Sequence, residues 1–166
     1  LFGASPDILV VERTPESMES YSPLQRFNEE VFINKSYEEA LMFLCGHLVN
    51  DFCYGPKILR SSAAKYFTSS TADRYNAGFD PLLIAASDRK SRPAPVISGV
   101  KIPIKYDLPE EATDLNALAF RVEQGVEITS ILLRYIRRAD PAKVLEFSER
   151  LNERHSQLNR MLKEQC

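Results

Sequence analysis

The last third of the chain carries the pattern that most constrains the fold, because it predicts two long helices joined by a short turn. Asp114 is a candidate N-cap for a helix that extends to about Arg138. Asp140-Pro141 then starts a second helix that ends near Glu164. A connection this short favours an antiparallel helical hairpin. Gly125 costs about 1 kcal/mol relative to alanine inside the first helix, so we expect a close packing neighbour or a bend there.

The second of these helices carries a narrow apolar seam on an otherwise charged surface. Apolar residues and one histidine recur along it at steps of three and four positions, and charged residues fill the remaining surface. A narrow seam of this kind is typical of a helix that packs against one neighbouring helix. We therefore predict a helix–helix interface made by Val144, Phe147, Leu151, His155, Leu158 and Leu162.

Two further helix starts lie nearer the N-terminus. Ser22-Pro23 combines an N-cap with a proline at the first helical position, which predicts a short helix near 23–32. Ser36-Tyr37-Glu38-Glu39 has the spacing of a capping box and predicts a helix that runs to about Cys53. Gly55 and Pro56 are suited to end it.

Two short segments have strand character. Ile8–Val11 is an apolar run, and Val100–Ile104 alternates apolar and polar residues, although Pro103 restricts it to an edge strand or an extended arm. Ile8–Val11 could be an arm that docks on a neighbouring chain or a strand in the protein's own core. We expect a mostly α fold with one or two short extended segments and a C-terminal antiparallel helical hairpin; a helix-dominated α+β fold is the alternative.

We expect two parts within this fold, packed together as one domain. Residues 1–112 would form a helical core subdomain with an N-terminal arm and a basic loop region, and residues 113–166 would form the C-terminal helical hairpin.

Charge is segregated along the chain although the net charge is only −2. Residues 1–56 carry three basic and nine acidic residues, whereas residues 57–105 carry nine basic and three acidic residues. We expect a helix over Lys57–Phe67 and an exposed, proline-containing loop over 87–95 in this basic segment. It could bind nucleic acid or the acidic surface of another protein. The candidate contact residues are Lys57, Arg60, Lys65, Arg74, Arg89, Lys90 and Arg92.

The sequence offers little for catalysis. Only two histidines are present, and no zinc-protease, serine-hydrolase, P-loop or dinucleotide-binding motif occurs. Cys45 and His47 lie about 200° apart on a helix, so they would not converge as a nucleophile–base pair or as metal ligands. We predict no catalytic residues, no metal site and no cofactor, and we do not expect an enzyme or a small-molecule substrate; a cysteine-dependent hydrolase is the less favoured alternative.

Composition bounds the compartment and the class of function. Three cysteines in 166 residues give no disulfide framework, which favours a reducing, intracellular compartment such as the cytoplasm or nucleus. No apolar run reaches the length of about 20 residues that a membrane-spanning helix needs. The chain does not begin with methionine, which suggests a segment of a longer protein.

We predict a non-catalytic helical interaction or assembly module of a larger protein or complex, which self-associates or binds a protein partner through helices and arms. The alternative is a nucleic-acid-binding nucleoprotein or capsid-like subunit that uses residues 57–105.

Overall fold

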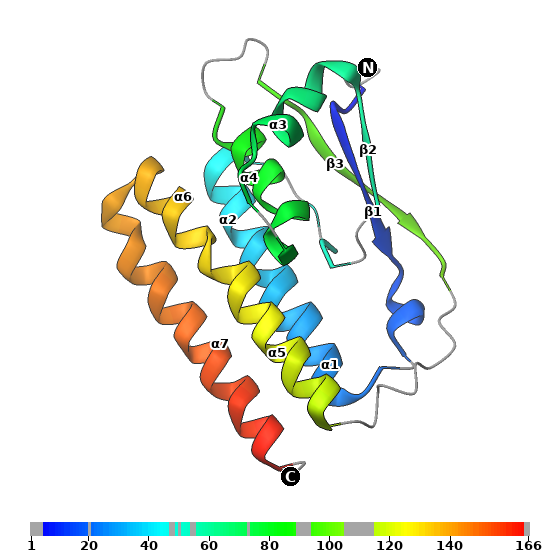
Figure 1. The fold of residues 1–166 in the computed structure, drawn as a ribbon, viewed down its shortest axis with the longest axis vertical. Coiled ribbons are helices and arrows are strands. Elements are labelled where there is room, and N and C mark those ends of the chain that lie inside the picture. Colours follow the sequence, from blue (N-terminus) through cyan, green and yellow to red (C-terminus); the bar gives the residue numbers. More distant parts are fainter. Residues whose placement is uncertain are drawn as a thin grey trace.

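The protein is mostly helical and carries one small sheet, which confirms the predicted fold class. The structure, a computed structural model, describes residues 5–19, 21–46, 49, 51–53, 56–72, 74–88, 94–104 and 115–164. Figure 1 shows long helices on one side of the molecule and three strands on the other, with the short helices α3 and α4 between them.

A nearly continuous helix from residue 23 to residue 45 forms the centre of the helical part. It consists of α1 (Pro23–Arg26), a wider π-type stretch η2 (Phe27–Asn34) and α2 (Lys35–Cys45). Ser22 caps it as predicted, because its side chain accepts a hydrogen bond from the Gln25 backbone N–H.

The predicted capping box at Ser36 is wrong, because Ser36 lies inside this helix. Its hydroxyl donates a hydrogen bond to the carbonyl oxygen of Phe32, four residues earlier. The predicted end near Cys53 is also wrong: Gly46 adopts a φ of 73° and its N–H bonds back to the carbonyls of Leu41 and Met42. Glycine tolerates this left-handed conformation, so the helix ends at Cys45.

The sheet has the order β2-β1-β3 and places the apolar N-terminal run at its centre. β1 (Ile8–Arg13) pairs antiparallel with β2 (Lys57–Leu59) and parallel with β3 (Ile97–Ile102). Ile8 and Val10 are fully buried in the core, so the first apolar run is a strand of the protein's own core. β3 is an edge strand, one of the two predicted alternatives, but it spans Ile97–Ile102 and ends before Pro103.

The region after β2 departs from the predicted helix over Lys57–Phe67. The strand is followed by a 3₁₀ turn, η3 (Ser61–Ala63), and α3 (Ala64–Ser69) begins only there. Lys57–Leu59 is extended because it pairs with Val10–Ile8, which a local sequence pattern does not reveal. A further 3₁₀ turn, η4 (Arg74–Gly78), leads to α4 (Asp80–Ala86). A similar short turn, η1 (Pro15–Met18), follows β1.

The C-terminal helices form the predicted antiparallel pair. α5 (Leu115–Ser130) and α6 (Leu132–Ala139) follow one another with an interruption at Ile131, and α7 (Val144–Glu164) returns alongside them (Figure 1). Asp140 caps the short turn η6 (Pro141–Lys143) by accepting a hydrogen bond from the Ala142 N–H at 3.0 Å.

One hydrophobic core includes residues from the sheet, the long helix and the C-terminal helices. Ile8 and Ile97 contribute to it from the sheet, Tyr37 from α2, Ile136 from α6 and Leu158 from α7. The predicted boundary at residues 112 and 113 falls within 105–114, outside the described residues, and stays a prediction.

Gly125 lies where η2 and α5 pack closely, as its position inside a helix suggested. Asn28 donates a hydrogen bond from Nδ2 to the carbonyl oxygen of Arg121 at 3.0 Å, which ties η2 to the backbone of α5. A Cβ atom at residue 125 would lie 2.5 Å from Asn28 Oδ1 and 3.2 Å from Phe32 Cδ1. Only glycine leaves room for this contact.

Gly125→Ala is therefore expected to lower the free energy of unfolding by about 1–3 kcal/mol, the usual cost of overpacking a core. The higher helix propensity of alanine would by itself stabilise the helix by about 1 kcal/mol. A net loss of stability would therefore show that the added Cβ atom clashes with its neighbours. Urea-induced unfolding measures it, with Ser130→Ala at an exposed position of the same helix as the control. A gain in stability for Gly125→Ala would contradict the close packing.

Candidate interaction grooves

The predicted seam of α7 faces the chain's own helices. Phe147 and Leu158 are buried, and the other four seam residues are half-buried. The ring of Phe147 lies 5.8 Å from that of Phe43 in α2, and the His155 ring stacks on Phe32 of η2 at 5.8 Å. The structure thus brings these residues together in an internal helix–helix contact.

Of the three described basic candidates, Arg60 and Lys65 are exposed. Lys57 is half-buried, with Nζ 5.6 Å from the centre of the Phe79 ring, and burial lowers the pKa of its amine. Lys65 forms an ion pair with Asp88 at 3.7 Å, whereas Arg60 is exposed after β2. The side chain of Arg74 and residues Arg89, Lys90 and Arg92 lie outside the description. Nucleic-acid binding by this segment stays a prediction.

A buried ion-pair cluster that the sequence analysis missed lies where β1 ends. The Arg13 side chain is 2% exposed; its Nε lies 2.7 Å from Asp51 Oδ2 and its Nη2 lies 2.8 Å from Glu29 Oε2. Arg13 Nη1 also donates to the Tyr21 hydroxyl, and Asn34 Nδ2 donates to Asp51 Oδ1. The only local signal is an arginine that continues an apolar strand, and its partners come from distant parts of the chain.

The charges of this cluster stabilise the fold. Burial alone would raise the pKa of Asp51, but hydrogen bonds and the charge of Arg13 outweigh it and lower the pKa. Burial disfavours the charged form of Arg13 and would lower its pKa, but the contacts with Asp51 and Glu29 outweigh this effect and raise the pKa above its usual range. Both groups therefore stay charged at neutral pH and hold β1, η2 and the segment at 51–53 together.

The Cys53 thiol beside this cluster is not activated. Burial raises the pKa of the Cys53 thiol, and the carboxylates of Glu29 and Asp51 raise it further. Cys45 Sγ donates a hydrogen bond to the Leu41 carbonyl oxygen at 3.3 Å. Within the described part of the chain, no three His, Cys, Asp or Glu residues form a cluster that could hold a metal ion, and His47 lies outside that part.

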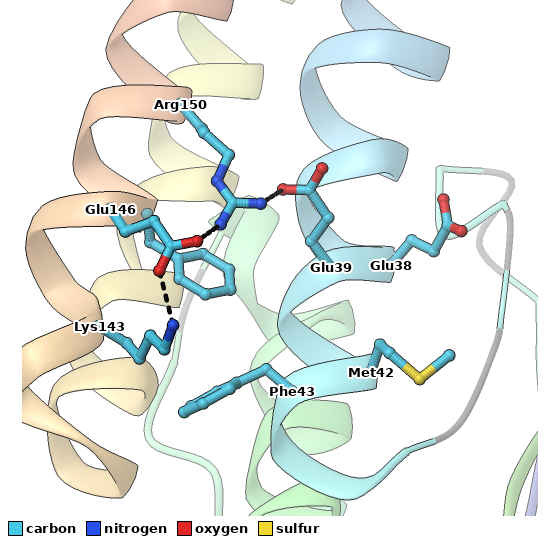
Figure 2. Close-up of a pocket in the computed structure, with 8 residues that line it drawn as sticks. Glu38, Glu39, Met42, Phe43, Lys143, Glu146 and Arg150 are labelled. Carbon is cyan, nitrogen blue, oxygen red and sulfur yellow. Dashed lines mark hydrogen bonds and ion pairs between the residues drawn. The ribbon is translucent and has the colours of Figure 1, made fainter.

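A groove of about 310 Å³ lies between α2 and the beginning of α7 (Figure 2). Met42, whose side chain is 44% exposed, and the aromatic pair Phe43 and Phe147 form its apolar part. The polar part consists of three carboxylates and two cations: Glu38, Glu39, Glu146, Lys143 and Arg150.

Ion pairs fix the charged side chains of this groove. Figure 2 shows Arg150 between Glu146 of its own helix and Glu39 of α2, which it approaches to 3.6 Å, while Lys143 lies 2.8 Å from Glu146. One turn further on, Arg154 contacts Glu39 at 2.5 Å. The groove therefore presents apolar side chains within a fixed pattern of both charge signs.

A second and larger groove, of about 490 Å³, lies between α5 and α7. Its apolar residues are mainly on α5, where Val126 is 36% exposed. Its charge differs from that of the first groove, because two carboxylates and neither lysine nor arginine are found among its described lining residues. The lining residues are Ala119, Val122, Glu123, Val126, Glu127, Ser130, His155, Asn159 and Leu162.

No protein-family model matches the chain, and neither a curated protein nor a solved structure is significantly similar to it. None of the described helices is long and apolar enough to cross a membrane.

Proposed function

We propose that the chain is a non-catalytic helical assembly module that self-associates through the groove between α2 and α7. The observation that carries this proposal is an exposed apolar side chain, Met42, next to an aromatic pair and within a fixed arrangement of both charge signs. Methionine adapts its shape to a partner surface, which suits it to a contact between chains.

The mixed charge of the groove favours a second copy of the same chain. A two-fold axis places a surface patch on its own copy, so a patch must be complementary to itself. The lining carries Glu38 and Glu39 on α2, Lys143 at the end of η6 and Arg150 on α7. In a two-fold contact, α2 of one copy can face α7 of the other and bring carboxylates near cations. Such charges select the partner and its orientation more than they add affinity.

The surface of α2 supports the same proposal. Lys35, Glu38 and Met42 follow one another at steps of three and four residues and so lie on one stripe of the helix. Lys35 and Glu38 form an ion pair at 2.7 Å, and this stripe continues the groove toward η2. A partner helix could therefore contact α2 over two turns.

Met42→Glu is expected to abolish this self-association, because it places a charge at the centre of the apolar contact. Sedimentation velocity from about 1 to 100 µM should show concentration-dependent dimerisation of the wild type and a monomer for the variant, the assembly being of moderate affinity. Ile58→Glu on β2, also at an exposed apolar residue, is the matched control and should dimerise like the wild type. A wild type that stays monomeric at 100 µM would refute the proposal.

A further inference from the structure

We propose that the groove between α5 and α7 binds a basic amphipathic helix of a different protein. This inference goes beyond self-association, because it concerns another groove and a partner of different chemistry. It depends on the shape of the groove, on its apolar residues and on its one-sided charge.

The apolar residues are spaced for a helical ligand. Ala119, Val122 and Val126 lie on α5 at steps of three and four residues, and Leu162 faces them from α7. The lined part of α5, residues 119–130, is about 16 Å long at 1.5 Å per residue. A helix laid into a groove of this length places two or three apolar anchors, spaced by three or four residues, against such a floor.

The charge of the groove selects the sign of the partner. Glu123 and Glu127 lie one turn apart on α5, and no lysine or arginine is among the described lining residues. Glu127 Oε1 accepts a hydrogen bond from Asn76 Nδ2 of η4 at 3.5 Å, and Glu123 is exposed. The α7 wall contributes Asn159, a neutral residue, and His155. Lysines or arginines along one flank of an amphipathic helix would complement the α5 wall.

The same charge argues against a second copy of this chain in the groove. A two-fold contact would place the two carboxylates of one copy near those of the other, and like charges across an interface disfavour binding. The α2–α7 groove, with both signs in its lining, has no such restriction. The two grooves on either side of α7 therefore suit different partners.

The test uses two labelled 18-residue helical peptides that share one leucine pattern, one with lysines and one with glutamates at the polar positions. Fluorescence anisotropy should show binding of the leucine–lysine peptide and binding at least tenfold weaker for the leucine–glutamate peptide. Glu123→Gln/Glu127→Gln should weaken the leucine–lysine complex at least fivefold, because it removes the complementary charge. The matched control, Glu38→Gln/Glu146→Gln in the other groove, should leave the affinity unchanged.

Nuclear magnetic resonance locates the peptide and keeps this proposal separate from self-association. In the Met42→Glu background, chemical shifts should change for amides near Val126 and Leu162. The proposal would be overturned if the peptide bound at α2 or if the leucine–lysine peptide did not bind at 100 µM. It would also be overturned if both peptides bound with equal affinity, or if both double variants lost affinity equally. Thermal unfolding confirms that the double variants are folded, and Val126→Lys gives a second test because it should also abolish binding.

Discussion

Arg13→Ala is expected to lower the free energy of unfolding by about 3–5 kcal/mol, the cost of removing one partner from a buried ion pair. The substitution leaves the carboxylates of Asp51 and Glu29 without the cation that lies within 2.8 Å of each. Asp51 is 4% exposed, so water cannot replace the lost contacts without opening the fold. Urea-induced unfolding measures the change as a shift of the midpoint.

The pH dependence provides a second readout for this variant. The wild-type Asp51 has a lowered pKa, so its stabilising contribution is complete above the unfolded pKa of about 3.9 and is lost as the pH falls through the folded pKa. In Arg13→Ala the guanidinium hydrogen bonds and charge are lost, whereas the residue-13 backbone N–H and Asn34 Nδ2 still oppose the effect of burial, so the pKa of Asp51 rises relative to the wild type. Protonation of Asp51 at low pH then removes the unpaired buried charge from the variant. The difference in the free energy of unfolding between the variant and the wild type should therefore be smaller at pH 3 than at pH 7.

Two controls separate the buried pair from general effects of losing an arginine. Arg26→Ala removes an exposed partner of Glu30 and should change stability by at most about 0.5 kcal/mol. Arg13→Met/Asp51→Asn should cost less than the two single substitutions added together, because the double variant leaves neither a charged Asp51 without Arg13 nor a charged Arg13 without Asp51. An Arg13→Ala variant within 1 kcal/mol of the wild type at pH 7 would contradict a structural role for the cluster.

Helix starts with a local chemical signature were predictable from the sequence. Ser22-Pro23 and Asp140-Pro141 each place a side-chain acceptor before a proline, and both caps are present in the structure. Ser36 carries an equally good local signature but lies inside a helix, where its hydroxyl bonds to Phe32 and accepts from Arg154 Nη1. A capping box indicates a possible start, and only the preceding residues decide whether the helix has already begun.

Features that depend on distant partners were not predictable in the same way. Lys57–Leu59 is a strand because β1 lies beside it, and the Arg13 cluster joins residues up to 38 positions apart. The seam of α7 identified the side that packs inward, but not the grooves on either side of it. Those grooves require α2 and α5 to lie next to α7, which the apolar pattern of α7 alone does not specify.

Leu158→Ala is expected to lower the free energy of unfolding by about 2–5 kcal/mol, the range for truncating a buried leucine. Leu158 is fully buried in the core between α7 and its neighbours, so the missing methyl groups would leave a cavity. Leu145→Ala is the matched control, because it makes the same chemical change in the same helix at a side chain that is 68% exposed. It should change stability by at most about 0.5 kcal/mol.

Comparing Leu158→Ala with Leu145→Ala shows whether the apolar seam of α7 packs within its own chain or against another chain. If α7 packs on its own chain, the loss for Leu158→Ala is independent of protein concentration, because the contact is intramolecular. If the seam were completed only by another chain, the loss would grow as dilution separates the copies. Urea unfolding of both variants at 1 and 50 µM measures this, and a concentration-dependent loss or equal losses for Leu158→Ala and Leu145→Ala would contradict the internal packing of α7.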